Sequence, residues 1–461
     1  MHTSQPSETI PTQLLQRFDV IGPRYTSYPT ADRFTEAFDA RAYRDSLARR
    51  HMPRPLSLYV HLPFCGSICY YCACNKVVTR DHGRATEYLR YLEREIEMQS
   101  ALLGRRNNVA QMHWGGGTPT FLSHAELAQL MAFIRERFRL EAKGEFSIEI
   151  DPRTLQPDTL ALLRSLGFNR ISMGVQDFDA EVQRAVHRVQ SEQQTLEAMA
   201  QARQLGFRSI NVDLIYGLPK QHGAGFNRTL DKVIESAPDR IALYNYAHLP
   251  ALFKPQRRIN QADLPSTDTR LQLLSLAIQR LTGAGYKYIG MDHFARPDDD
   301  LAVAQRHGRL QRNFQGYSTG AECDLIGLGV SAIGQVGPTY SQNVKSLEEY
   351  YERLEQGALP ILRGIELTPD DLVRRSVIQS LMCRFEVPIE SLEIAHLVDF
   401  KSYFAWERAE LQLLQNVGVL TLDDQWLTVS ALGRFFIRNI CMVFDRYLRE
   451  NRPRGRYSKA L

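Results

Sequence analysis

Residues from about 55 to 300 alternate between short β-like runs and helical patterns, and this rhythm constrains the fold most strongly. The runs expected to form strands are 57–62, 109–114, 145–150, 170–175, 208–217, 240–246 and 286–291. The helical patterns between them cover 85–103, 124–138, 158–166, 191–205, 226–235 and 268–282. Strands that alternate with helices predict an α/β fold with a parallel sheet. Six or seven successive units favour an incomplete (β/α)6-type barrel over a doubly wound sheet.

The regions before and after this core have different patterns. Residues 1–45 are polar and rich in turn-forming residues, so they predict an ordered but irregular segment that contacts substrate. Its motif GPRYTSYPT offers Arg24, Tyr25 and Tyr28 as contact groups. The barrel is expected to span 46–350 and a second domain 360–461.

The second domain is expected to be mainly helical and winged-helix-like. Thr368-Pro-Asp-Asp371 has the pattern of a helix start, with a capping threonine, a proline at the first position and an acid at the third. Residues 417–430 predict a hairpin. The helical patterns cover 368–383, 401–416 and 431–449.

Charge and hydropathy exclude several classes of protein. The formal net charge is only +4 over 461 residues, whereas a nucleic-acid-binding protein usually carries a concentrated basic stripe. The second domain is therefore expected to pack against the barrel or cover substrate. The N-terminus lacks the pattern of a secretory signal, and no apolar stretch reaches the ~18 residues of a membrane helix. We expect a cytoplasmic protein with free thiols, no membrane or nucleic-acid partner, and no need for more than a monomer.

The ten residues CGSICYYCAC at 65–74 hold four of the seven cysteines. Cys65, Cys69 and Cys72 follow the spacing C-x3-C-x2-C on what is expected to be one loop. Three thiolates on one loop suit an iron–sulfur cluster and would leave one iron open to a small molecule. Structural zinc sites usually add a second cysteine pair or late histidines, and sparse cysteines fit disulfides poorly. The cluster is therefore favoured over both alternatives, with Cys74 too close to Cys72 to be a ligand.

Polar groups recur at the C-terminal ends of the expected strands, where parallel barrels place their chemistry. The glycines of GGGTP at 115–119 let a ligand approach the backbone closely, but the segment lacks the ending of a phosphate loop. Residues 325–334 form a second close-approach segment, for which a tight turn is the alternative interpretation. The polar strand ends are Tyr59, Glu149, Gln176, Asp213 and Asn245.

The cysteine loop, with YVHLPFC before it and CNK after it, resembles the signature of radical S-adenosylmethionine (SAM) enzymes. Segments along most of the chain resemble the oxygen-independent coproporphyrinogen III dehydrogenases of haem biosynthesis. They are GPRYTSYPT, HWGGGTPTFL, SIEIDPRTL, RISMGVQDF, DLIYGLPKQ, YNYAHLP, GMDHFARPDDDLA, NFQGYSTG and RNICMVFDRYL.

Two other functions are weighed against this resemblance. Haem-chaperone-like relatives share the barrel and the three cysteines, but they typically lack the C-x-C of Cys72 and Cys74 and the GPRYTSYPT segment. Both features are present here. A radical SAM methylase that acts on another substrate is the third alternative.

The resemblance implies that Cys65, Cys69 and Cys72 hold one [4Fe–4S] cluster whose fourth iron binds a first SAM, with a second SAM nearby. Cys74 is then a candidate catalytic residue, or alternatively a small packing residue. The implied contacts of the first SAM are Tyr59, Gly116, Glu149 and Ile333. Those of the second SAM are Tyr71, Gly117, Thr118, Gln176, Arg188, Asp213 and Ala247.

The same resemblance implies the anaerobic oxidative decarboxylation of coproporphyrinogen III to protoporphyrinogen IX. A low-potential donor, similar to flavodoxin or ferredoxin, would reduce the cluster so that SAM is cleaved to methionine and a 5′-deoxyadenosyl radical. This radical would take a β-hydrogen from a propionate, and loss of CO2 and of one electron to an unidentified acceptor would leave a vinyl group. Two propionates and two SAM molecules are consumed per turnover. Arg24 is a candidate partner for a propionate.

Overall fold

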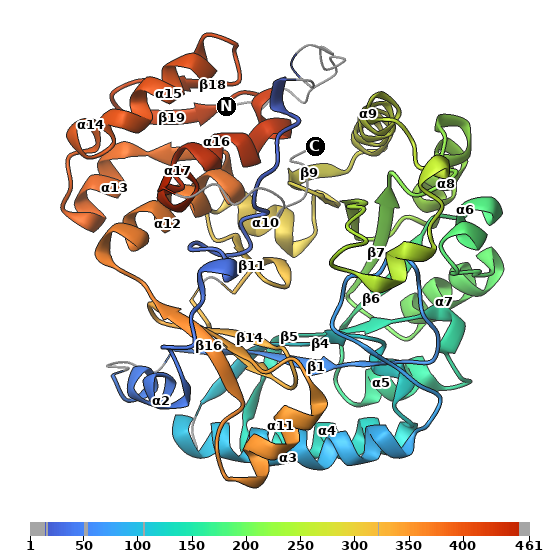
Figure 1. Ribbon diagram of the computed structural model, residues 1–461. Coiled ribbons are helices and arrows are strands. Elements are labelled where there is room, and N and C mark those ends of the chain that lie inside the picture. Colours follow the sequence, from blue (N-terminus) through green and yellow to red (C-terminus); the bar gives the residue numbers. More distant parts are fainter. Residues whose placement is uncertain (1–13, 15–16, 50–53, 105–106, 321, 451–461) are drawn as a thin grey trace.

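The computed structural model describes residues 14, 17–49, 54–104, 107–320 and 322–450. Within these residues a twelve-stranded curved sheet forms the centre of the molecule (Figure 1), in the order β16-β15-β14-β13-β1-β4-β5-β6-β7-β8-β10-β9. Its parallel strands are β1 (Leu56–Leu62), β4 (Asn108–Gly116), β5 (Arg139–Ile150), β6 (Arg170–Gln176), β7 (Ser209–Tyr216), β8 (Arg240–Asn245) and β13 (Asp324–Leu328). The predicted incomplete parallel barrel is confirmed.

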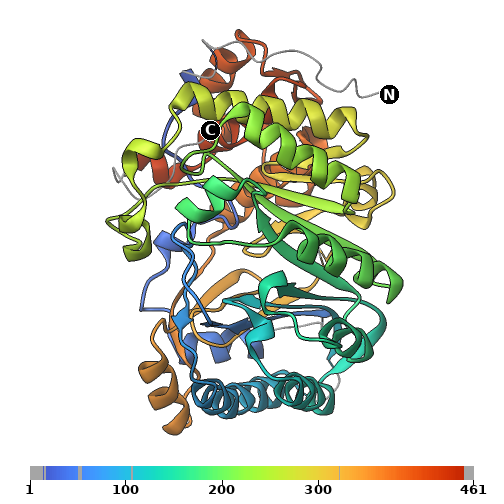
Figure 2. The same ribbon diagram turned by 90° about the vertical axis from the view of Figure 1, so that its right-hand side faces the viewer.

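Helices cover the outer face of this sheet (Figures 1 and 2). Most of them begin at a side chain that caps the first turn; Ser123 and Glu126, for example, form a reciprocal capping box at the start of α4. Among the described residues, no helix combines the length and apolarity that crossing a bilayer requires. The outer helices are α3 (Gly83–Leu103), α4 (His124–Arg137), α5 (Thr159–Ser165), α6 (Ala180–Ala185), α7 (Glu192–Gln204), α8 (Gly223–Ser236) and α9 (Thr267–Gly283).

The two edges of the sheet differ from the prediction. The run expected as a seventh parallel strand forms β9 (Lys287–Gly290), which reaches β8 only through the antiparallel strand β10 (His293–Ala295). At the other edge β14 (Ile333–Val336), β15 (Thr339–Asn343) and β16 (Ile361–Glu366) are antiparallel. The sheet therefore continues past residue 350, where the barrel was expected to end.

The C-terminal region contains α12 (Pro369–Arg384), α13 (Ile389–His396), α14 (Phe400–Tyr403) and α15 (Ala405–Gln415), which confirms its mainly helical character. Thr368 and Asp371 form the predicted capping box of α12. The predicted hairpin, β18 (Leu420–Leu422) and β19 (Trp426–Val429), is joined by β17 (Glu386–Pro388) into a three-stranded antiparallel sheet in this part of the described chain.

The helix predicted over 431–449 is broken into η6 (Gly433–Phe436), α16 (Ile437–Val443) and α17 (Arg446–Glu450). The break before α17 has a local cause, because the carboxylate of Asp445 accepts hydrogen bonds from the backbone N–H groups of Tyr447 and Leu448. A carboxylate that binds free N–H groups in this way starts a new helix.

The N-terminal segment packs into the C-terminal domain. Tyr25 and Tyr28 are each only 1% exposed, and the Tyr25 hydroxyl donates to the Asp445 carboxylate at 3.0 Å. Arg438 donates to the carbonyl oxygens of Gly22 and Pro23. The two tyrosines, expected as contact groups, therefore contact the protein's own core, whereas the prediction that residues 1–45 include a substrate-contacting segment stays a prediction.

Glu95 of α3 makes the stability of the barrel pH-dependent. Its buried carboxylate accepts hydrogen bonds from Gly329 N–H, Asn343 and Tyr350, yet burial raises its pKa from 4.5 to about 7. Between about pH 4.5 and 7 the folded state therefore holds a proton on Glu95 that the unfolded state has released. The stability that comes from this bound proton is lost as the pH rises through that range. We expect Glu95→Gln to gain stability relative to wild type over that range, by at most about 3 kcal/mol. Thermal melts at several pH values would show this, and a parallel pH dependence of both proteins would contradict it.

Candidate active site

The cysteine loop begins directly after β1, at the C-terminal end of the barrel. A short parallel pairing of β2 (Phe64–Cys65) with β3 (Val77–Val78) closes the loop at its base. The three thiols, together with Cys74, line one cavity of about 500 Å³. The loop therefore presents all its cysteines to one space.

Most of the residues expected from the sequence line this same cavity. They are Cys65, Cys69, Cys72, Cys74, Tyr71, Gly116, Gly117, Thr118, Glu149, Gln176, Arg188 and Asp213. Three others lie outside its lining. Tyr59 lies behind Glu149, stacked on His113, Ile333 lies in β14, and Ala247 lines a neighbouring pocket.

Two arginines point at Cys69. Guanidinium nitrogens of Arg153 and Arg188 each lie 3.7 Å from its sulfur, and Asp151 accepts from both arginines, at 2.6 and 3.1 Å. Burial acts to raise the pKa of Asp151, but the hydrogen bonds and charges of the two arginines outweigh it and lower the pKa. Cys69 therefore lies beside two cationic side chains. The sequence analysis missed Asp151 and Arg153, although their place directly after a strand was a usable signal.

Cys72 is the most acidic thiol of the loop. A hydrogen bond from the Cys74 thiol and the charge of Lys76 outweigh burial and lower the pKa of Cys72 to about 6. The Lys76 ammonium also donates to the Cys72 carbonyl at 3.0 Å. Cys65 differs, because burial raises its pKa to about 11 although Thr118 donates to its sulfur. Cys74 thus lies beside a thiol whose pKa is lowered.

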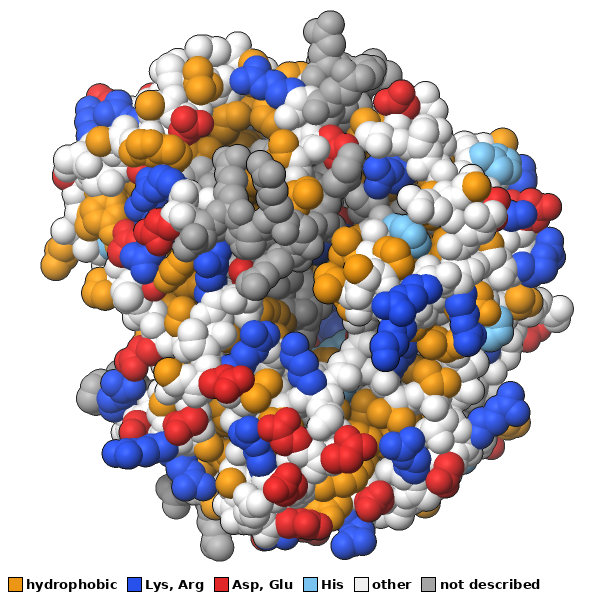
Figure 3. Space-filling view, viewed as in Figure 1, with side chains coloured by type: hydrophobic (Ala, Val, Ile, Leu, Met, Phe, Trp, Pro, Cys, Tyr) orange, Lys and Arg blue, Asp and Glu red, His pale blue; other side chains and the backbone are white. Residues whose placement is uncertain are grey.

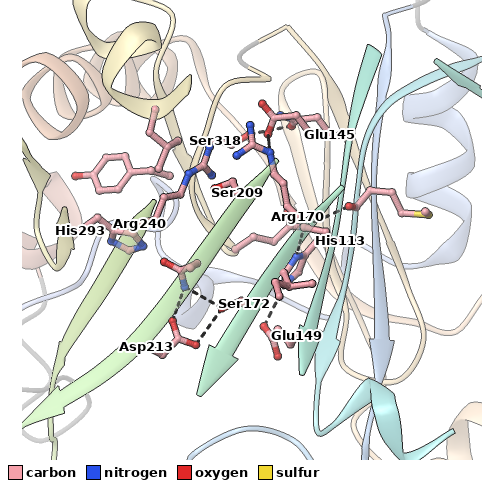
Figure 4. A pocket seen from close by; sticks show the side chains of 18 of the residues that line it. His113, Glu145, Glu149, Arg170, Ser172, Ser209, Asp213, Arg240, His293 and Ser318 are labelled. Carbon is pink, nitrogen blue, oxygen red and sulfur yellow. Dashed lines mark hydrogen bonds and ion pairs between the residues drawn. The ribbon is translucent and has the colours of Figure 1, made fainter. Parts of the chain in front are cut away.

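The pKa values of the carboxylates Glu149 and Asp213, which both line the cavity drawn in Figure 4, shift in opposite directions. Burial acts to raise the pKa of Glu149, but the hydrogen bond and charge of His113 and the N–H of Gly116 lower it. Burial, reinforced by the negative charge of Glu149, raises the pKa of Asp213 to about 7. A cationic ligand near Asp213 would stabilise its ionised form.

A second cavity of about 160 Å³ lies inside the barrel and shares Glu149, Ser172 and Asp213 with the first. On its far side Arg170 contacts Glu145 at 3.4 Å (Figure 4). Arg240, which also lines the cavity, pairs with Asp299 at 2.8 Å. The sequence analysis did not identify these residues, because single polar positions within strands carry little signal.

The donor set fits a thiolate-bound cluster with a polar ligand beside it. Gln176 has a positive φ of 68°, a strained conformation that such residues adopt mainly at functional sites. Its buried Oε1 and the Nε of Arg188 have no hydrogen-bond partner among the described residues. No three His, Cys, Asp or Glu side chains of the described chain surround a site for a single metal ion. Three separate thiols are instead the ligands that iron–sulfur clusters use.

Gly117 is required for the shape of the site. A Cβ added there would stand 2.6 Å from the carbonyl carbon of Pro63 and 2.7 Å from the Phe64 oxygen, both backbone atoms of the cysteine loop. We expect Gly117→Ala to displace this loop at a cost of about 1–3 kcal/mol and to lower the thermal midpoint and the cluster content together. Gly66→Ala is the control, since its Cβ would meet nothing within 4 Å. Equal behaviour of the two variants would contradict this account.

Known proteins share both the domains and the full length of this chain. The model of the radical SAM superfamily matches residues 59–233, and that of the HemN C-terminal domain matches 367–436. The chain is 52% identical over 454 residues to the oxygen-independent coproporphyrinogen III oxidase of Pseudomonas aeruginosa, covering 97% of this chain and 98% of the relative. The same-named protein of Escherichia coli is 50% identical over 448 residues, with 97% and 98% covered.

A solved structure agrees with these relatives. The coproporphyrinogen III oxidase (HemN) from Escherichia coli, a radical SAM enzyme, superposes with a TM-score of 0.92 at 49% identity, over 95% of this chain and 99% of that chain. These relatives give no support to a haem-chaperone-like protein. The chain therefore belongs to the family of oxygen-independent coproporphyrinogen III oxidases, within the radical SAM superfamily.

Proposed function

We propose that this chain converts coproporphyrinogen III to protoporphyrinogen IX without oxygen, by oxidative decarboxylation of two propionates. One observation carries the proposal: four thiols, three carboxylates and Arg188 line one cavity in a chain that covers 98% of the length of its relatives. The Lys and Arg side chains beside the central hollow of the face in Figure 3 suit a substrate with four carboxylates.

Membership of the radical SAM superfamily implies a [4Fe–4S] cluster and SAM. When bound, these groups supply a low-potential electron and an organic radical that removes a hydrogen atom. We infer that Cys65, Cys69 and Cys72 hold the cluster and that Arg153 and Arg188 stabilise negative charge at Cys69. Cys74 is retained as a candidate catalytic residue beside Cys72.

The protein's own groups would bind and orient two SAM molecules. For the first we infer Tyr59, Gly116, Glu149 and Ile333. For the second we infer Tyr71, Gly117, Thr118, Gln176, Arg188, Asp213 and Ala247. The cavity lining supports most of these assignments, and Gln256 supports that of Ala247, because its amide donates to the carbonyl oxygens of both Tyr71 and Ala247.

The proposal also includes a flavodoxin- or ferredoxin-like electron donor, an electron acceptor and a monomeric protein. It divides the chain into an N-terminal segment, a barrel and a C-terminal domain. Two apolar cores bear on this division. The buried residues of the first lie between 38 and 361, and the second joins residues 373–444 to the N-terminal segment and to the barrel edge at 271–317.

The test is an anaerobic turnover experiment with the reconstituted, reduced protein, SAM and coproporphyrinogen III. We expect two 5′-deoxyadenosines and two CO2 for each protoporphyrinogen formed. Formation of 5′-deoxyadenosine without decarboxylation would show that the protein cleaves SAM but acts on a substrate other than coproporphyrinogen III. Tight haem binding without either product would refute the proposed function.

A further inference from the structure

A separate pocket lies next to the candidate active site at the ends of β7 and β8. It has a volume of about 410 Å³, and we call it the Arg270 pocket. The buried side chain of Gln256 bridges Tyr71 of the active site and Ala247 of the pocket, at 3.2 and 3.1 Å. The two cavities are thus neighbours. The pocket is lined by Ile21, Gly217, Asn245, Tyr246, Ala247, His248, Leu249, Gln261, Leu264, Pro265 and Arg270.

Arg270 is a half-buried cation in the lining of this pocket. Its guanidinium donates to the Thr267 hydroxyl at 3.1 Å, and its buried Nε has no hydrogen-bond partner among the described residues. The ion pairs of the described chain do not include it. An arginine fork that lines a cavity without a carboxylate partner is suited to bind one from a ligand.

The charge behind the pocket is also positive. Arg24 donates to the carbonyl oxygen of Asn245, a lining residue, and Arg438 holds the backbone next to Ile21. Burial and the charge of Arg24 lower the pKa of Arg438 to about 9. Asp292, which pairs with Arg24 at 3.2 Å, supplies one opposing charge. An anion in the pocket would therefore be attracted by more than Arg270 alone.

The remaining walls suit a ligand that is partly apolar. Leu249, Leu264 and Pro265 line the pocket, and Ile21 is 50% exposed beside it. His248 adds a polar group, since its Nδ1 lies 2.9 Å from the Tyr246 hydroxyl and burial lowers its pKa. The pocket thus combines apolar walls with a cationic base, as a carboxylate on a short hydrocarbon arm requires.

We propose that the Arg270 pocket binds one propionate of the tetrapyrrole substrate, with Arg270 as the partner of its carboxylate. This inference rests on the proposed function and adds a substrate-binding residue to it. A propionate anchored here, beside the active site, would fix the orientation of the macrocycle and thereby select which propionate reacts.

The test is the binding of coproporphyrin III, the stable oxidised form of the substrate, to the anaerobic holoprotein. Arg270→Gln is expected to weaken its binding about tenfold to a hundredfold, and to leave the binding of its tetramethyl ester and of SAM unchanged. Arg270→Lys should recover part of the affinity. Arg280→Gln is the matched control, since Arg280 lies on the same helix but pairs with Asp231 of α8.

A second variant covers the case in which Arg270→Gln does not fold. Gln261 is exposed and lines the pocket, so Gln261→Glu places a negative charge there and should also weaken binding of the tetra-acid more than of the ester. The proposal would be overturned if Arg270→Gln bound coproporphyrin III with wild-type affinity, or if the variant lost as much affinity for the tetramethyl ester as for the acid. Turnover by the wild-type preparation separates that outcome from a failure of the proposed function.

Discussion

Cys69→Ala is expected to abolish both cluster assembly and turnover. Cys69 is the thiol that two guanidinium groups approach at 3.7 Å, and it is almost fully buried, at 9% exposure. Loss of one of three thiolates leaves a second iron without a protein ligand. Changes in outer partners of metal sites already cost about 10–100-fold in affinity, so removal of a direct ligand should cost more than about 100-fold. The measurements are iron and sulfide content and 5′-deoxyadenosine formation.

Two other cysteines provide controls for this result. Cys323→Ala removes a half-buried thiol that lies outside the loop, so it should keep the cluster and the activity. Cys74→Ala should keep the iron content, because Cys74 is not a proposed ligand, whatever its effect on turnover. A full cluster in Cys69→Ala, or a lost cluster in Cys74→Ala, would contradict the ligand assignment.

Glu149→Ala is expected to weaken SAM binding about tenfold to a hundredfold, the range for loss of a charge-assisted hydrogen bond, while the cluster stays intact. The carboxylate of Glu149 is kept ionised by His113 and by the N–H of Gly116. It therefore offers a fixed negative charge for ribose hydroxyls or a sulfonium group. SAM titration of the reconstituted protein would measure the dissociation constant.

The variant Glu149→Gln separates charge from shape, since an amide oxygen can still accept from Gly116. If Glu149→Gln loses less SAM affinity than Glu149→Ala, the difference between the two variants measures the contribution of side-chain shape, and the loss that remains in Glu149→Gln measures the contribution of charge. Asp213 adds a further readout, because its pKa of about 7 is raised partly by the charge of Glu149. Removal of that charge should lower the pKa of Asp213. Unchanged SAM affinity in Glu149→Ala would refute the assignment.

The parallel strands could be predicted because apolar and polar residues alternate in them, as in β5, where the buried Phe146, Ile148 and Ile150 alternate with polar residues. The edges of the sheet could not be predicted in this way. The sequence of β9 resembles those of the parallel strands, but β10 lies between β8 and β9 and pairs with both of them. The break before α17 depends on the side-chain conformation of Asp445, which a helical pattern does not reveal.

Residues of the candidate site could be predicted where they belong to a sequence motif. They could not be predicted where their role depends on contacts with residues that are distant in the sequence. The cysteine spacing identifies the proposed cluster-binding loop, and the glycines at 115–117 identify a segment whose backbone a ligand can approach closely. Asp151 acquires its role only because Arg153 and Arg188 meet on it beside Cys69. The positive φ of Gln176 is equally invisible in its residue type, since glutamine has no preference for that conformation.

The packing of the N-terminal segment against Arg438 and Asp445 has a consequence for biosynthesis. Tyr25 and Asp445 are 420 positions apart in the chain, and domains generally fold from the N-terminal side while the ribosome is still adding residues. The barrel strands can pair during that period, but Tyr25 cannot contact Asp445 until the C-terminal helices have been synthesised. Translation of the last helices therefore completes the wall formed by Ile21, and the proposed propionate pocket is among the last parts of the nascent enzyme to form.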